Sequence, residues 1–155
     1  MGRRILDFAF AASMLLAPMP VHARDDCQDS PPRDPTLRPI VVDRSFFIYF
    51  DWDSAAIAPQ AASILENVAS VYSDQPRCII VVAGHADRSG PAGSNLALSR
   101  RRAEAVADWL RRRGVRTRLR IEFHGEARPL VETPDGVHEP QNRRAEILVV
   151  PSGTP

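Results

Sequence analysis

The spacing of hydrophobic and polar positions over residues 40–150 predicts four strands and two helices. The strands are expected where short apolar, β-branched or aromatic runs end at turn residues, namely 46–50, 78–83, 118–123 and 145–150. The helices are expected where apolar residues recur every three or four positions, from Pro59 to about Tyr72 and from about Asn95 to Arg113. The order β-α-β-α-β-loop-β predicts a two-layer α/β sandwich in which helices pack on a mixed sheet.

The second strand and the second helix carry the clearest patterns. Residues 78–83, with the sequence CIIVVA, are apolar throughout, as in a central strand that is buried on both faces. One stripe of the helix should face the sheet and comprises Leu96, Ala103, Val106, Ala107 and Leu110. Arg102 falls on a second, narrower stripe with Leu98, Ala105 and Trp109. We therefore expect Arg102 at the border of the buried surface.

Residues 1–23 have the layout of a secretory signal peptide. Two arginines precede an apolar run from Phe8 to Pro18, and small residues follow at a possible cleavage point. An uncleaved N-terminal anchor is the alternative. Residues 24–39 are charged and proline-rich, which predicts a tail or linker, and residues 151–155 form a short C-terminal tail. This interpretation places the protein in the periplasm.

Export would allow a disulfide between the two cysteines, Cys27 and Cys78. Such a bond would close a loop of about 50 residues and could stabilise the fold by about 4 kcal/mol. The alternative is a buried Cys78 and a free Cys27 thiol in the tail.

The charge balance narrows the function classes. All 20 basic residues are arginine, against 19 acidic residues, for a net charge of +1. This balance argues against nonspecific binding of polyanions, which needs a large excess of cations. The absence of lysine excludes Schiff-base catalysis and a P-loop lysine.

Four strings of residues occur in a fixed order between residues 46 and 150. They are IYFDWDSAAIAPQA from Ile48, VAGHADRSGPAGSNLALSRRRAEAVADWL from Val82, FHGEARP from Phe123 and QNRRAEI from Gln141. Together they resemble the C-terminal domain of outer-membrane protein A, which also occurs in peptidoglycan-associated lipoproteins and flagellar stator proteins. The resemblance implies a domain that binds cell-wall peptidoglycan noncovalently through the diaminopimelate of its stem peptide. It implies neither catalysis nor a cofactor, and other envelope proteins are further candidate partners.

The resemblance assigns the diaminopimelate contacts to Asp87 in GHADRSG and Arg102 in LSRRRA. The free end of diaminopimelate is a zwitterion, so its receptor needs a fixed anion beside a fixed cation. Asp87 can accept from the ammonium, and Arg102 can present a bidentate fork to the carboxylate, which lysine cannot reproduce. The alternatives are that Asp87 caps backbone amides and that Arg102 pairs with Glu104 or Asp108.

Four further positions match residues that line or shape the pocket of the family: Phe50, Asp51, Asn95 and Arg143. Asn95 is also a good helix N-cap, which could be its only role. A solvated arginine is an equal interpretation of Arg143.

Two other function classes remain open. His85, Asp87, His124 and Glu126 are metal-ligand types and could belong to a secreted metal-dependent hydrolase. The absence of HExxH and of a recognisable nucleophile argues against it. The arginine-rich stretch 100–120 could bind nucleic acid, but an exported, nearly neutral domain has little access to nucleic acid.

Overall fold

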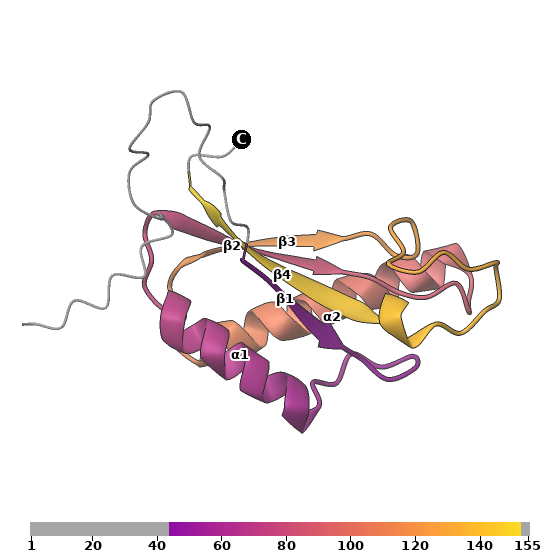
Figure 1. The fold of residues 1–155 in the computed structure, drawn as a ribbon, viewed down its shortest axis with the longest axis horizontal. Helices are drawn as coiled ribbons and strands as arrows, with labels where there is room; N and C mark the ends of the chain where they lie inside the picture. The colour runs from indigo at the N-terminus through magenta and orange to yellow at the C-terminus, as the bar shows by residue number, and fades with distance from the viewer. Residues whose placement is uncertain (1–43, 153–155) are drawn as a thin grey trace, which may run out of the picture.

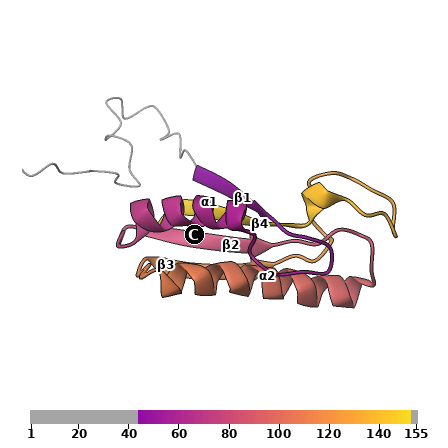
Figure 2. The ribbon, with the colours of Figure 1, turned by 90° about the horizontal axis from the view of Figure 1, so that it is seen from below.

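Two helices pack on one face of a four-stranded mixed sheet (Figures 1 and 2) in this computed structural model, which describes residues 44–152. In chain order the elements are β1 (Arg44–Tyr49), α1 (Pro59–Tyr72), β2 (Cys78–Gly84), α2 (Ala92–Arg112), β3 (Arg118–Phe123), the 3₁₀ helix η1 (Pro140–Asn142) and β4 (Arg144–Pro151). The predicted two-layer α/β sandwich with a mixed sheet is therefore confirmed.

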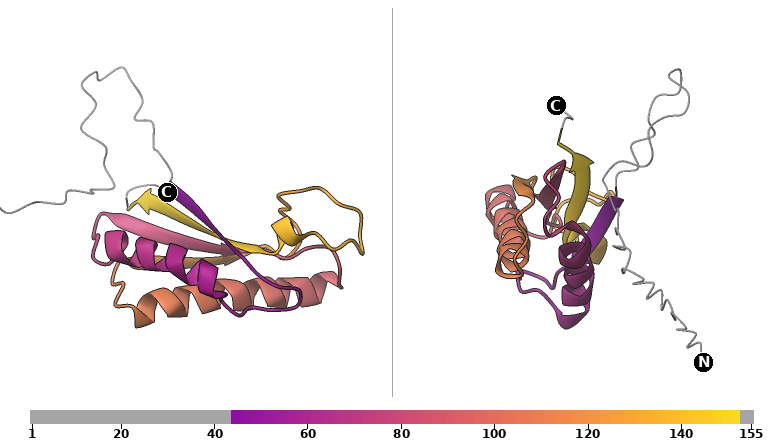
Figure 3. Two further views of the ribbon diagram at one scale, coloured as in Figure 1. Left: turned by 60° about the horizontal axis from the view of Figure 1, so that its bottom comes forward. Right: turned by 90° about the vertical axis from the view of Figure 1, so that its left-hand side faces the viewer.

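The strands lie in the order β1-β4-β2-β3. β2 and β3 pair in parallel because α2 connects them as a crossover, and β4 runs antiparallel to both of its neighbours, β1 and β2. All seven residues of β2 are buried, as its unbroken apolar sequence predicts. The carboxyl end of this central strand points into the loops gathered at one end of the sandwich (Figure 3).

The hydrophobic core lies between the sheet and the two helices. Alternate strand residues such as Ile48, Ile80 and Ile147 meet Leu65 of α1 and Leu110 of α2. Burying each such side chain contributes about 1.5–3 kcal/mol. α2 approaches β2 very closely at its end, because a Cβ on Gly84 would lie 1.9 Å from the Ser99 carbonyl oxygen. Glycine at position 84 therefore lets the helix reach the loops beyond the strand.

Several local expectations are wrong. α2 begins at Ala92, three residues before Asn95, because Pro91 occupies the N-cap position. Leu96 and Phe123 are exposed although their patterns place them in the core. The 21 residues of α2 span about 31 Å, whereas the seven of β2 span about 23 Å, so the first turns of the helix extend past the sheet.

The predicted signal peptide and the charged tail lie outside the described residues. Among residues 44–152, neither α1 nor α2 combines the length and the hydrophobicity that a membrane-spanning helix requires. Cys78 is buried at the start of β2 and is not a free thiol. Cys27 lies outside the described residues, so its pairing with Cys78 stays a prediction.

Candidate functional site

Three loops meet beyond the carboxyl end of β2: the β1–α1 loop, the β2–α2 loop and the long β3–β4 loop (Figure 3). Hydrogen bonds from Arg102 join the first two loops, and hydrogen bonds to Asp87 join the second to the third. The end of a central strand is where open α/β sheets bind ligands. The structure therefore brings Phe50, Asp51, Asp87, Arg102 and Arg143 into one cluster.

Asp87 is a buried carboxylate, with 3% of its surface exposed. Its Oδ1 accepts a hydrogen bond from Ser89 Oγ at 2.7 Å. Its Oδ2 accepts from the Glu139 backbone N–H at 3.2 Å and from Arg143 Nη1 at 3.3 Å. Burial acts to raise the pKa of Asp87, but these hydrogen bonds outweigh it and hold the pKa below its ordinary value. Asp87 is thus a fixed anion at neutral pH.

Arg102 is fully buried, not at the border of the buried surface as its stripe predicts, because the β1–α1 loop covers it. Its Nε donates to the Ser54 carbonyl at 2.8 Å, Nη1 to the His85 carbonyl at 2.8 Å and Nη2 to the Asp51 carbonyl at 3.0 Å. A guanidinium has five N–H groups, so one remains on each terminal nitrogen. Burial lowers the pKa of Arg102 to about 10, partly opposed by the charge of Asp87, so the group stays cationic at neutral pH.

The alternative ion pairs for Arg102 are wrong, because both carboxylates bind other arginines. Glu104 pairs with Arg100 and Asp108 with Arg111 on the exposed side of α2. The guanidinium of Arg102 instead lies over the ring of Phe50, 5.2 Å from its centroid. Such a cation–π contact is strongest where water is excluded.

Arg143 is the second cation of the cluster. Its side chain is 14% exposed, so the solvated-arginine interpretation is wrong. Nε donates to the Phe50 carbonyl at 3.2 Å while Nη1 contacts Asp87, and the Phe50 backbone N–H donates to the Arg143 carbonyl at 2.8 Å. Arg143 therefore ties the end of β1 to the anion. Asp51 contributes its carbonyl, while its residue surface is exposed.

Asn95 is not the N-cap of α2 but lies inside its first turns, buried. Its amide nitrogen donates to the Gly90 carbonyl at 3.0 Å and to the carboxylate of Glu126. Asn95 thereby joins α2 to the β2–α2 loop through Gly90 and to the loop after β3 through Glu126.

Four residues of this cluster are not predicted from the sequence: Trp52, Ser89, His138 and Glu139. Trp52 and Ser89 lie inside two of the resemblance strings, and a tryptophan in a polar turn is a signal that could have drawn attention. His138 and Glu139 lie outside every motif. No pattern along the chain connects them to Asp87.

The metal site of the hydrolase hypothesis is not assembled. Within residues 44–152, no group of three His, Cys, Asp or Glu side chains could hold a metal ion. The rings of His85 and His124 lie 5.2 Å apart, but His85 faces Glu146 and Asp87 is bound by Ser89 and Arg143. Burial first, and then the charge of Arg144, lower the pKa of His85 to about 4, so its ring is neutral.

The arginine-rich stretch 100–120 is not an open basic surface. Five of its nine arginines pair with carboxylates: Arg100, Arg111, Arg113, Arg116 and Arg120. Arg102 is buried as well. Because a nucleic-acid surface needs unpaired cations facing the phosphates, this arrangement gives the nucleic-acid hypothesis no support.

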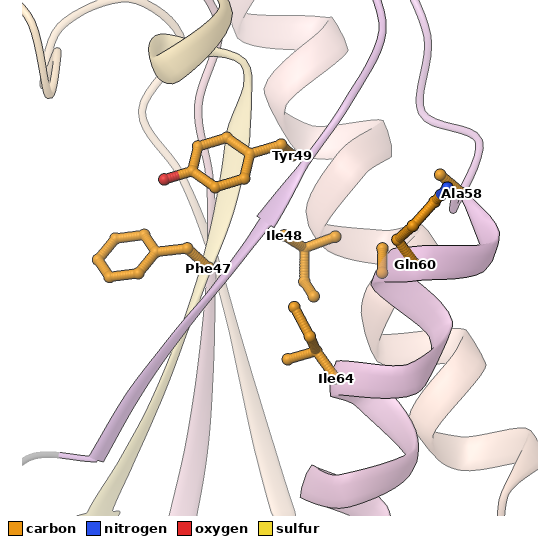
Figure 4. Close-up of a pocket in the computed structure, with 7 residues that line it drawn as sticks. Phe47, Ile48, Tyr49, Ala58, Gln60 and Ile64 are labelled. Atoms are coloured by element: carbon orange, nitrogen blue, oxygen red, sulfur yellow. The ribbon is translucent and has the colours of Figure 1, made fainter.

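A separate apolar pocket of about 270 Å³ lies between β1 and α1, where Ile48 and Ile64 point toward one another (Figure 4). Tyr49 and Gln60 also line it. None of the site residues predicted from the sequence lines this pocket, so it is distinct from the Asp87 cluster.

The fold and the cluster together define a small α/β sandwich domain with a buried carboxylate at the end of its central strand, bound by Arg143 and close enough to the buried Arg102 to act on its charge. A family model described as the OmpA family matches residues 49–143, more than half of the chain. The chain therefore belongs to the OmpA family, as the resemblance predicted.

Individual relatives agree with this assignment. The peptidoglycan-associated lipoprotein of Brucella melitensis is 38% identical over 107 residues, covering 68% of this chain and 64% of the relative. The peptidoglycan-associated lipoprotein structure from Burkholderia pseudomallei matches with a TM-score of 0.62 at 32% identity, covering 70% of this chain and 92% of that chain. The cell wall anchor of the T6SS from Pseudomonas aeruginosa matches with a TM-score of 0.59 at 26% identity, covering 74% and 86%. The matches span 30% to 64% of the length of three curated relatives.

Proposed function

We propose that this chain binds peptidoglycan noncovalently and serves as an anchoring protein of the cell envelope. Family membership supports this proposal, together with relatives named peptidoglycan-associated lipoprotein and cell wall anchor. The chain acts in the periplasm after removal of the predicted signal peptide, without a cofactor and without catalysis.

The ligand group is the free zwitterionic end of diaminopimelate in the stem peptide. The observation that carries this proposal is the ionised Asp87 carboxylate beside the cations Arg102 and Arg143. Asp87 accepts hydrogen bonds from the ligand ammonium, and the arginines hold the ligand carboxylate. Each charge of the site therefore faces the opposite charge of the ligand, as recognition of a zwitterion requires.

The burial of Arg102 determines how a ligand reaches it. Its two unassigned N–H groups, one on each terminal nitrogen, can receive a carboxylate in bidentate geometry. Because Arg102 has no exposed surface, the Phe50 ring or the β1–α1 loop must shift when the ligand enters. Arg143 is partly exposed and makes the first contact.

Cosedimentation with purified sacculi tests the proposal. Wild type should bind sacculi that contain diaminopimelate, and Asp87→Asn and Arg102→Lys should each weaken binding about 10- to 100-fold. The first variant removes the anion, and the second replaces the bidentate fork with a single ammonium. Arg100→Lys is the matched control, since Arg100 lies on the exposed side of the same helix and pairs with Glu104. Circular dichroism of each variant separates lost binding from lost folding.

Sacculi with lysine in place of diaminopimelate provide a second control, because the lysine side chain ends in an ammonium without a carboxylate. Wild type should bind these lysine-containing sacculi much more weakly than sacculi that contain diaminopimelate. If wild type sediments with neither kind of sacculi, binding to the cell wall is rejected. Unchanged binding of Asp87→Asn and Arg102→Lys would reject the site, and equal binding to both sacculi would reject recognition of the zwitterion.

A further inference from the structure

An exposed aromatic pair lies beside Asp87, and the contacts proposed above leave it unused. The rings of Trp52 and His138 meet edge to face, with centroids 5.8 Å apart. Trp52 is 61% exposed and the His138 side chain 60% exposed. Trp52 lies in the β1–α1 loop and His138 in the β3–β4 loop, so the pair forms only when the two loops come together.

Short contacts connect this pair to the anion. Trp52 Nε1 donates to Ser89 Oγ at 3.3 Å, and Ser89 Oγ donates to Asp87 Oδ1. His138 Nδ1 lies 4.0 Å from Asp87 Oδ2. The Trp52 ring is therefore connected to the Asp87 carboxylate through one intervening side chain, and the His138 ring lies next to the carboxylate. Both rings are exposed to solvent.

The exposure of Trp52 has no explanation in the packing of the domain. The other tryptophan, Trp109, packs against the hydrophobic core, whereas Trp52 leaves most of its large apolar surface in water. The turn that presents Trp52 places Asp53 at φ +46°, a left-handed conformation that aspartate tolerates better than most residues. An apolar ring held in water beside a fixed anion is suited to a ligand that carries hydrocarbon next to a positive charge.

We propose that Trp52 and His138 form an aromatic wall that packs against the methylene chain of the diamino acid whose ammonium lies at Asp87. This inference rests on the proposed function, since it names the part of the same ligand that the wall contacts. The methylene groups follow directly on the charged end of the diamino acid, whereas the glycan is joined to the stem several bonds further away. Because His138 lies 4.0 Å from the Asp87 carboxylate, the wall is placed for the nearer group. The wall makes the site selective for a zwitterion that ends a hydrocarbon chain.

Calorimetric binding of the stem tripeptide that ends in diaminopimelate, with and without its disaccharide, tests the wall. Trp52→Ala should weaken binding of both probes about tenfold, while Trp52→Phe, which keeps an aromatic face, should weaken it less than about threefold. Tyr49→Ala is the matched control, because Tyr49 is an exposed aromatic residue at the end of β1 and is not among the hydrogen-bond partners of Asp87, which are Ser89, Glu139 and Arg143. Trp52→Ala should bind both probes to the same reduced extent.

Tryptophan fluorescence provides a readout that a merely structural role would not change. The chain has two tryptophans, so Trp109→Phe leaves Trp52 as the only tryptophan, and its emission is excited selectively at the red edge of the absorption band, where tyrosine does not absorb. Saturation with the tripeptide should protect its emission from quenching by iodide. Unprotected emission from a bound complex would contradict the wall.

The outcomes separate this inference from the proposed function. If wild type binds the tripeptide and Trp52→Ala binds it equally well, the wall is wrong and the proposed function stands. If Trp52→Ala weakens binding of the disaccharide probe but not of the tripeptide alone, the aromatic pair contacts glycan and the inference is wrong. If wild type binds neither sacculi nor tripeptide, the proposed function fails and the wall fails with it.

Discussion

Replacing Arg102 by methionine should destabilise the fold itself, apart from any effect on binding. Methionine keeps an unbranched apolar stem, but it removes three hydrogen bonds to the carbonyls of Ser54, His85 and Asp51. Those carbonyls belong to two separate loops, Ser54 and Asp51 to the β1–α1 loop and His85 to the β2–α2 loop. The guanidinium therefore acts as a clamp between the loops.

The magnitude follows from the surroundings of each bond. The bond to the His85 carbonyl is buried, and a buried acceptor left without a donor costs about 1–3 kcal/mol. The bonds to Ser54 and Asp51 are only partly buried, so water can replace the donor at about 0.5–1.5 kcal/mol each. Removing a buried charge offsets part of this loss. We expect a net loss of about 2–4 kcal/mol from the free energy of unfolding.

Urea unfolding of wild type, Arg102→Met and Arg100→Met measures this loss. Arg100 is exposed and its pair with Glu104 is an i,i+4 pair, so Arg100→Met should cost no more than about 0.5 kcal/mol. If the two variants lose the same stability, the clamp is wrong and the three carbonyls are satisfied without Arg102.

Two further predictions concern stability. The lowered pKa of His85, about 4, means that the unfolded chain takes up the proton first as the pH falls below 6.5. Urea unfolding should therefore show wild type losing up to about 3 kcal/mol relative to His85→Gln between pH 6.5 and pH 4, and a constant difference would refute the burial of a neutral ring. Gly84→Ala should lower the melting temperature strongly because its Cβ would meet the Ser99 carbonyl at 1.9 Å. Gly93→Ala, with nothing within 4 Å, should leave it unchanged or raise it, and equal effects of the two alanines would contradict the close approach of α2 to β2.

The elements of the fold were predictable because each one depends on a local pattern. The apolar period and Pro59 place α1 at Pro59–Tyr72, and the unbroken apolar run places β2 in the centre of the sheet. The predictions fail where the burial of a residue depends on the element that packs against it. Leu96 belongs to the apolar stripe of α2, but it is exposed because the helix extends past the sheet. The periodicity of the helix sequence carries no information about the length of the strand that faces it.

The sequence by itself determined the order of strands and helices, the α/β class, the family and the candidates Asp87 and Arg102. Only the tertiary structure decided what those residues touch. Arg102 donates to three backbone carbonyls, and because every residue carries a carbonyl, no sequence pattern marks such acceptors. The pairing of Trp52 with His138 likewise depends on two loops far apart in the chain. Local periodicity records which face of an element is buried, whereas a site made by converging loops exists only once the sheet has brought their ends together.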